Sequence, residues 1–242
     1  MPHRVAVLAL DGVLPLDLGI PARVFNEACE PDGTRLYSVS TCSLGGRPVR
    51  THEDYRLVVD HDESLLETAD TVVIATQEPG EELLATGALP EELAAALARM
   101  GPRTRIVSLC TSAFLLAAAG LLDGRRATTH WALCDALARL FPAVEVDPDV
   151  LFVDNGRILT SAGGAAASTC ACTWSGWTTG RRWPRPPRGA AWWRRGARAG
   201  RRSSSSTPFR RTPTGPRRRP GSGRWTGWPS RSPWRTWPGT RT

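Results

Sequence analysis

Lysine is absent from this chain of 242 residues, and its 31 basic residues are all arginine. Residues 166–242 contain no acidic residue and no leucine, isoleucine, valine or methionine. A segment without aliphatic side chains cannot bury enough apolar surface to offset the entropy lost on folding. The chain therefore divides into a core-forming part, residues 1–165, and a tail, residues 166–242, that we expect to be non-globular.

Features of membrane and secreted proteins are also missing. No apolar run is long enough to span a bilayer, and RVAVLAL at residues 4–10 is too short for a signal peptide. The cysteines Cys29, Cys42, Cys110 and Cys134 show no paired metal-binding spacing. We therefore expect a cytoplasmic protein with reduced thiols, no membrane contact, no metal and no cofactor.

Charge is distributed unevenly between the two parts. Thirteen arginines against all 23 acidic residues give residues 1–165 a net charge of −10, whereas the other 18 arginines make the tail +18. Binding of nucleic acid requires clustered basic side chains that neutralise phosphates. The acidic part is therefore unsuited to that role.

The tail also holds nine of the ten tryptophans, whereas disordered segments are usually poor in aromatic residues. Tryptophan has the single codon TGG, and reading one nucleotide earlier gives NTG, which encodes leucine, valine or methionine. Read in this way, STCACTWSG at residues 168–176 becomes IDLCLHLVR, which has an amphipathic helical pattern. We interpret the chain from about Ala167 as out of frame, after the loss of one G near Ala166–Ala167.

In residues 1–165, short apolar runs alternate with helical patterns. The strand-like runs are RVAVLAL (4–10), YSVSTC (37–42), TVVIAT (71–76) and RIVSLC (105–110). The helical patterns are IPARVFNEA (20–28), PEELAAALARM (90–100) and WALCDALARLF (131–141). Continuous apolar strands between helices predict an α/β fold of three layers with a mostly parallel sheet. Residues 146–154 and 157–163, joined across Asn155-Gly156, read as a hairpin or an edge pair.

Cys110 directly follows a predicted buried strand, and residues 111–119 have a helical pattern. A thiol at a strand-to-helix elbow lies near a helix N-terminus, which favours the thiolate. Ser108 and Ser112 are the small neighbours that such an elbow needs. The alternative is that Cys110 is a buried packing residue.

Two other residues have competing interpretations. His130 precedes a predicted helix and is either a residue at a helix start, with Thr129 as the cap, or a catalytic base. Asp17 is either a cap for the helix predicted near Ile20 or a carboxyl that exchanges a proton with the Cys110 thiol.

Three segments carry a resemblance: RVAVLALDGVLPLDLGIPARVF (4–25), CTSAFLLAAAGLLDGRRATTHW (110–131) and VDPDVLFVDNGRILTSAG (146–163). They resemble the ThiJ/PfpI-type, class I glutamine amidotransferase-like domain found at the front of GlxA-like regulators of the AraC family. The resemblance implies a flavodoxin-like α/β/α sandwich in which Cys110 is the elbow cysteine, Asp17 its acidic partner and His130 the following histidine. The tail segment 225–242, restored to VDGLAEPLTVEDLARHAD, resembles the start of an AraC-type helix-turn-helix.

This sequence departs from the family pattern at two places. Many relatives have glycine where this chain has Ser112, and several enzymes have a glycine pair where it reads Ala75-Thr76-Gln77. These departures favour ligand binding over turnover. Thr111, Ser112 and Gln77 are the candidate ligand-binding residues.

The sequence is compatible with three functions. The first is a ligand-sensing, dimerising domain of an AraC-family regulator, which would bind an unidentified small molecule and a second copy of itself. DNA would be bound only by an intact full-length relative. The second is a Cys110-dependent enzyme resembling isonitrile hydratase. In the third, the arginine- and tryptophan-rich tail is genuine and binds nucleic acid non-specifically.

Overall fold

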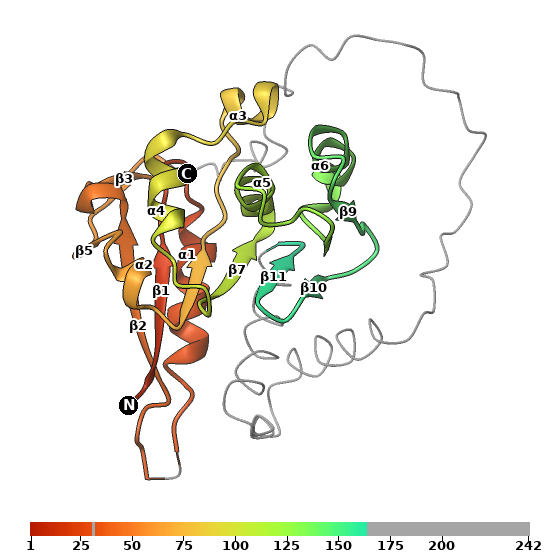
Figure 1. The fold of residues 1–242 in the computed structure, drawn as a ribbon. Coiled ribbons are helices and arrows are strands. Elements are labelled where there is room, and N and C mark those ends of the chain that lie inside the picture. Colours follow the sequence, from red (N-terminus) through yellow and green to blue (C-terminus); the bar gives the residue numbers. More distant parts are fainter. Residues whose placement is uncertain (31, 164–242) are drawn as a thin grey trace, which may run out of the picture. The chain divides into compact units, whose positions relative to one another are not determined.

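The computed structural model describes residues 1–30 and 32–163 (Figure 1). Its main sheet consists of β1 (His3–Leu8), β2 (Tyr37–Ser43), β5 (His61–Asp62), β6 (Thr71–Ile74), β7 (Arg105–Leu109), β10 (Phe152–Asp154) and β11 (Ile158–Ser161). The strand order is β10-β11-β7-β6-β1-β2-β5. Every neighbouring pair is parallel except β10 with β11, which are antiparallel as the sequence predicts.

Helices and two small sheets connect these strands. The α-helices are α1 (Pro15–Phe25), α2 (Leu65–Thr68), α3 (Glu81–Thr86), α4 (Glu91–Ala98), α5 (Ala113–Ala118) and α6 (Cys134–Leu140). The 3-10 turns are η1 (Leu44–Gly46), η2 (Cys110–Ser112) and η3 (Trp131–Leu133). β3 (Val49–Arg50) pairs antiparallel with β4 (Arg56–Leu57), and β8 (Arg126–Ala127) pairs parallel with β9 (Glu145–Val146).

The central strands are buried on both faces, which explains their continuous apolar sequences. In β1, Val5 and Val7 belong to the core on one face of the sheet, while Ala6 and Leu8 belong to the core on the other. A covered parallel sheet produces this pattern because successive side chains point to opposite faces. The predicted three-layer α/β/α class is therefore confirmed.

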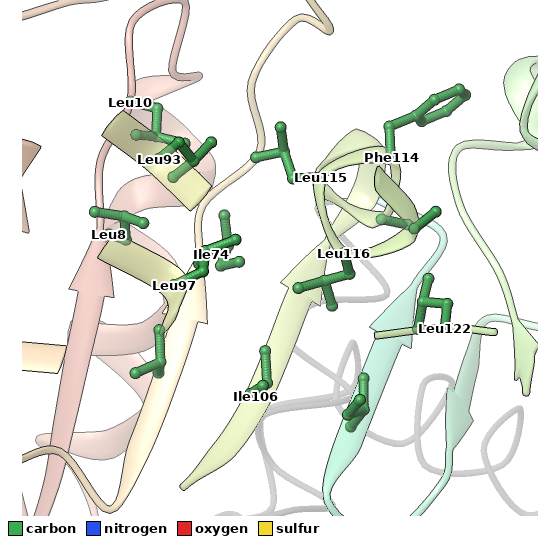
Figure 2. Packing of buried hydrophobic residues seen from close by; sticks show 14 of the residues in the cluster. Leu8, Leu10, Ile74, Leu93, Leu97, Ile106, Phe114, Leu115, Leu116 and Leu122 are labelled. Atoms are coloured by element: carbon green, nitrogen blue, oxygen red, sulfur yellow. The ribbon is translucent and has the colours of Figure 1, made fainter. Parts of the chain in front are cut away.

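The two faces are covered unequally by the described helices. Side chains of α2 to α6 contribute to one core, and Figure 2 shows Leu97 of α4 and Leu116 of α5 close to the strand residues Ile74 and Ile106. Among the described helices, only α1 contributes to the other core, through Val24 and Phe25. The single helix α1 is also the one that carries Asp17.

Two predicted helix starts are corrected by the structure. α1 begins at Pro15 rather than near Ile20, because proline suits the first helical position, where its missing N–H would have no helical partner. Asp17 therefore lies inside the first turn and is not a cap. Before η3 the cap is His130, whose Nδ1 accepts a hydrogen bond from the N–H of Ala132, and not Thr129.

No helix in the described part of the chain is long and apolar enough to cross a membrane. The interpretations of the tail, including the change of reading frame, concern residues outside the described ranges.

Candidate functional site

Cys110 directly follows β7 and is the first residue of the 3-10 turn η2. Its φ is 54°, and among the described residues it is the only one besides glycine with a positive φ. This left-handed conformation costs about 1–3 kcal/mol for an ordinary residue and persists only where its surroundings hold it. A strained strand-to-helix turn is the geometry that presents a nucleophile at the edge of an α/β sheet. The predicted elbow is present, and the catalytic role of Cys110 stays a prediction.

Hydroxyl groups after the cysteine attach the turn to the segment that follows β6. The Thr111 hydroxyl donates a hydrogen bond to the carbonyl of Gln77, and Ser112 Oγ donates to the carbonyl of Ala75 at 2.5 Å. The hydroxyl hydrogens of both residues are therefore used within the fold. A ligand contact by Thr111 or Ser112 would need their oxygens as acceptors, so their predicted binding role stays a prediction.

Two further threonines fix the turn from other directions. Thr129 Oγ1 donates to the carbonyl of Cys110 at 3.0 Å, and Thr76 Oγ1 donates to the carbonyl of Leu109 at 3.3 Å. Both hydroxyls are buried, where a hydrogen bond is costly to lose. Segments following β6 and β8 therefore both brace the strained turn.

The Cys110 thiol is protonated at neutral pH. The side chain is 6% exposed, and its burial raises the pKa of the thiol to about 12. A backbone hydrogen bond at Thr111 lowers this pKa, but the Asp17 charge raises it further. This pKa shift is opposite in direction to the one expected for a thiol at a helix N-terminus, because desolvation is its largest cause.

Asp17 is close enough to Cys110 to act on it electrostatically, and it is itself 5% exposed. Burial raises the pKa of its carboxyl, although a hydrogen bond with Thr76 opposes the shift. Desolvation by burial is the larger of these two effects, so the pKa of the Asp17 carboxyl lies above its usual value.

Gly163 belongs to this site, although the sequence analysis did not single it out. Its φ is 141°, and a Cβ built on it would lie 3.7 Å from Cys110 Sγ. β7 and β11 are parallel neighbours, so the residues that follow them meet at the same edge of the sheet. The sequence shows a small-residue run, Ser161 to Gly163, at the end of β11, but only the structure shows that this run lies beside Cys110.

His130 stands apart from the other candidates. Its Nδ1 accepts from the N–H of Ala132 at 3.3 Å, and its ring packs at 5.5 Å from the exposed ring of Trp131. Burial lowers the pKa of the imidazole, so it is neutral at pH 7. Within residues 1–30 and 32–163, no hydrogen bond joins His130 to Cys110. The structure brings Asp17, Thr111, Ser112 and Gln77 to the elbow and leaves His130 at its border.

Two buried hydroxyls near the elbow lack hydrogen bonds. Ser108 Oγ and Thr128 Oγ1 have no partner among the described residues, and both side chains are fully buried. The neighbouring Thr129 is equally buried but bonds to Cys110. Because an unpaired buried hydroxyl costs free energy, the two adjacent threonines have opposite effects on stability.

In the part of the chain that the structure describes, no group of three or more histidine, cysteine, aspartate or glutamate side chains could hold a metal ion.

We expect Thr129→Val to lower the free energy of unfolding by about 1 kcal/mol, because it removes one buried hydrogen bond to the strained turn. Thr128→Val is the matched control and should be neutral or stabilising, since it removes a hydroxyl without a partner. Urea unfolding of both variants at pH 7 measures the difference. Equal losses in the two variants would contradict this account of the turn.

The thiol of Cys110 should react with a small neutral reagent such as methyl methanethiosulfonate at a rate that still rises about tenfold per pH unit between pH 8 and 10.5. A raised pKa keeps the thiolate fraction small and proportional to hydroxide over this range. Asp17→Asn should increase the rate, because the charge that raises the thiol pKa is removed. Peptide mapping by mass spectrometry measures modification at Cys110. A plateau near pH 9, as for an unperturbed thiol, would disprove the assignment.

Three relatives place the chain among known sequences. It is 41% identical over 143 residues to a Streptomyces lividans protein from the cpoL 5' region, covering 59% of this chain and 97% of that protein. It is 34% identical over 135 residues to the HTH-type transcriptional regulator GlxA of Rhizobium meliloti, covering 55% of this chain and 40% of the regulator. It is 44% identical over 68 residues to isonitrile hydratase of Pseudomonas putida, covering 28% of each.

Solved structures share the fold. Drosophila melanogaster DJ-1beta matches with a TM-score of 0.61 and 19% identity, covering 75% of this chain and 92% of the other. An AraC family transcriptional regulator from Pseudomonas putida matches with a TM-score of 0.56 and 18% identity, covering 73% and 92%. The family model for DJ-1/PfpI proteins matches residues 3–172. With the elbow cysteine and the parallel sheet in place, the chain belongs to the DJ-1/PfpI family.

Proposed function

We propose that the folded part of this chain is the ligand-binding and dimerising domain of a cytoplasmic AraC-family regulator of the GlxA-like type. The similarity to GlxA covers 40% of that regulator's length, as expected for one domain of a larger protein. The net charge of −10 on residues 1–165 is consistent with a part that does not itself contact DNA. In this proposal the DNA-binding half is missing from the translated frame.

The state of Cys110 is the observation that carries the ligand-binding role. The elbow geometry is kept at φ 54°, yet burial raises the pKa of the thiol to about 12 and leaves a poor nucleophile. Burial also raises the pKa of the neighbouring Asp17 carboxyl, which favours the neutral form of that carboxyl. A site with a protonated thiol is suited to hold a small ligand by hydrogen bonds and contacts rather than to transform it.

A second candidate is an isonitrile hydratase activity, favoured by the 44% identity over 68 residues to that enzyme. The Cys110 sulfur would form a bond to the isonitrile carbon, and the proton relayed by Asp17 would complete a thioimidate, R–N=CH–S–Cys. Water would then add at this carbon and release the formamide R–NH–CHO with the thiol regenerated. Thr111 and nearby backbone N–H groups would position the substrate.

Incubation of the purified chain with an alkyl isonitrile decides between these candidates. We expect formamide to form no faster than with the Cys110→Ala variant, because the thiol is protonated and the glycine pair of several related enzymes is replaced by Ala75-Thr76-Gln77. Chromatography of the formamide measures the rate. Turnover that is lost in Cys110→Ala but retained in Thr128→Val would establish the enzyme and overturn the regulator proposal.

We further propose that the tail is the out-of-frame translation of the last helix of the domain, a linker and the start of a helix-turn-helix. Resequencing the coding DNA across Ser161–Gly176 tests this proposal. We expect one additional G near Ala166–Ala167, which restores IDLCLHLVR. The frame-shift proposal is wrong if independent isolates lack this G and if their codons, read one nucleotide earlier, do not encode the helical segment.

A further inference from the structure

Two hydroxyl residues, Ser108 and Thr160, lie side by side in a core that is otherwise largely apolar. They are paired in register on the adjacent parallel strands β7 and β11. Ile106 and Ile158, which lie two residues earlier on these strands, belong to the core that α2 to α6 cover. Because side chains alternate between the two faces of a sheet, Ser108 and Thr160 point into this same core.

Thr128, the residue that follows β8, completes a group of three. Its backbone N–H donates a hydrogen bond to Thr160 Oγ1 at 2.9 Å, which places Thr128 against the Thr160 hydroxyl. The Thr160 hydroxyl accepts this bond and can also donate its own hydrogen. All three residues are 0% exposed, so bulk water does not reach their hydroxyls. We call Ser108, Thr128 and Thr160 the hydroxyl cluster.

Two members of the hydroxyl cluster need a hydrogen-bond partner. Ser108 Oγ and Thr128 Oγ1 have none among the described residues. Buried hydroxyls in folded proteins are nearly always bonded to protein or to ordered water, because their lost hydration is otherwise uncompensated. Two such groups on either side of Thr160 indicate one common partner between them.

The spacing of the strands fits a single water molecule. Neighbouring strands lie about 4.8 Å apart, which separates paired side chains by more than one hydrogen bond. Two O–H···O bonds of about 2.8 Å that meet at one oxygen span about 4.5 Å. A buried water typically makes about three hydrogen bonds to polar groups that lack other partners. The hydroxyl cluster supplies three such groups.

We propose that the hydroxyl cluster of Ser108, Thr128 and Thr160 binds one internal water molecule. Ser108 lies two residues before Cys110, and Thr128 precedes Thr129, whose hydroxyl bonds to the carbonyl of Cys110. The water therefore links β7, β11 and the segment after β8 close to the strained turn. This site is separate from the ligand-binding role proposed for Cys110 and does not depend on it.

The near-neutral stability expected for Thr128→Val is compatible with this water. A water-mediated hydrogen bond replaces bonds that the same groups make to bulk water, so its net contribution to folding is small. In Thr128→Val the hydroxyl that required a partner is removed, and the water keeps Ser108 and Thr160. Unfolding measurements therefore do not report on the site, and the water itself has to be detected.

Nuclear Overhauser effects (NOEs) between water and backbone N–H groups detect internal water in solution. The N–H of Thr128 donates to Thr160 Oγ1 and therefore lies next to the proposed site. On the full chain, deuterated and labelled with nitrogen-15, we expect an NOE between water and this N–H. The N–H of Ile106 is the matched control, because Ile106 is also 0% exposed but donates to the carbonyl of Arg157. It should show no such effect.

A double variant, Ser108→Ala with Thr128→Val, separates bound water from exchange through a hydroxyl. It removes two partners of the water but keeps the Thr160 hydroxyl, which accepts from the N–H of residue 128. We expect the NOE at residue 128 to be lost in this variant and retained in Thr128→Ser, which keeps the hydroxyl. Absence of the NOE in the unmodified chain would overturn the proposal. So would its persistence in the double variant, where the Thr160 hydroxyl is its remaining source.

A crystal structure of the full chain gives a second measurement that needs no variant. We expect electron density for a water within hydrogen-bonding distance of Ser108 Oγ, Thr128 Oγ1 and Thr160 Oγ1. Side-chain rotamers that instead bond Ser108 and Thr128 directly to protein atoms would overturn the proposal.

Discussion

The left-handed backbone of Cys110 is the constraint on which the site depends. This conformation is unfavourable by about 1–3 kcal/mol, so the turn exists only because neighbouring segments hold it. Hydroxyls of threonine and serine supply the restraint. Those of Thr111 and Ser112 donate to backbone carbonyls of the segment after β6, and two other threonine hydroxyls donate to the carbonyls of Leu109 and Cys110. Parallel strands make this possible. Because β6, β7 and β11 run in the same direction, their carboxyl ends lie at the same end of the sheet, and the residues that follow them lie close together.

Burial decides the chemistry that this turn can perform. Cys110 and Asp17 are both almost fully buried, and desolvation raises the pKa of each acid. Within residues 1–30 and 32–163, no basic side chain contributes to either pKa shift. The same elbow geometry that could present an attacking thiolate thus holds a thiol whose pKa is raised by burial, beside a buried carboxyl whose pKa is also raised.

The unequal layers explain how Asp17 reaches this position. α1 is the one described helix that contributes to its face of the sheet, and it begins at Pro15, which places Asp17 in the first turn. Pro21 lies inside the same helix and has no N–H with which to bond the carbonyl four residues earlier, that of Asp17. The start of α1 therefore carries a buried carboxyl and a backbone carbonyl without its usual helical partner. Both features result from prolines that are visible in the sequence.

By itself, the sequence determined the class of the fold. The runs at residues 4–10, 71–76 and 105–110 could only be central strands, since their continuous apolar residues require cover on both faces. It also determined the elbow at Cys110, because a small-residue turn between a strand and a helix has a recognisable spacing. Helix starts were less predictable: Pro15 and His130 rather than Ile20 and Thr129 mark them, and caps depend on backbone geometry that spacing does not express.

Tertiary structure decided how the site behaves. Whether Cys110 is a thiol or a thiolate depends on burial by segments far away in the chain, and no local pattern contains that information. Gly163 became part of the site only because β11 lies next to β7, whose paired residues are 52 positions earlier in the sequence. His130 makes no hydrogen bond to Cys110 within the described residues, and its ring nitrogen instead accepts from the N–H of Ala132 at the start of η3. The sequence specifies which chemical groups are present, but the desolvation of these groups and their proximity to one another arise only when distant segments pack together.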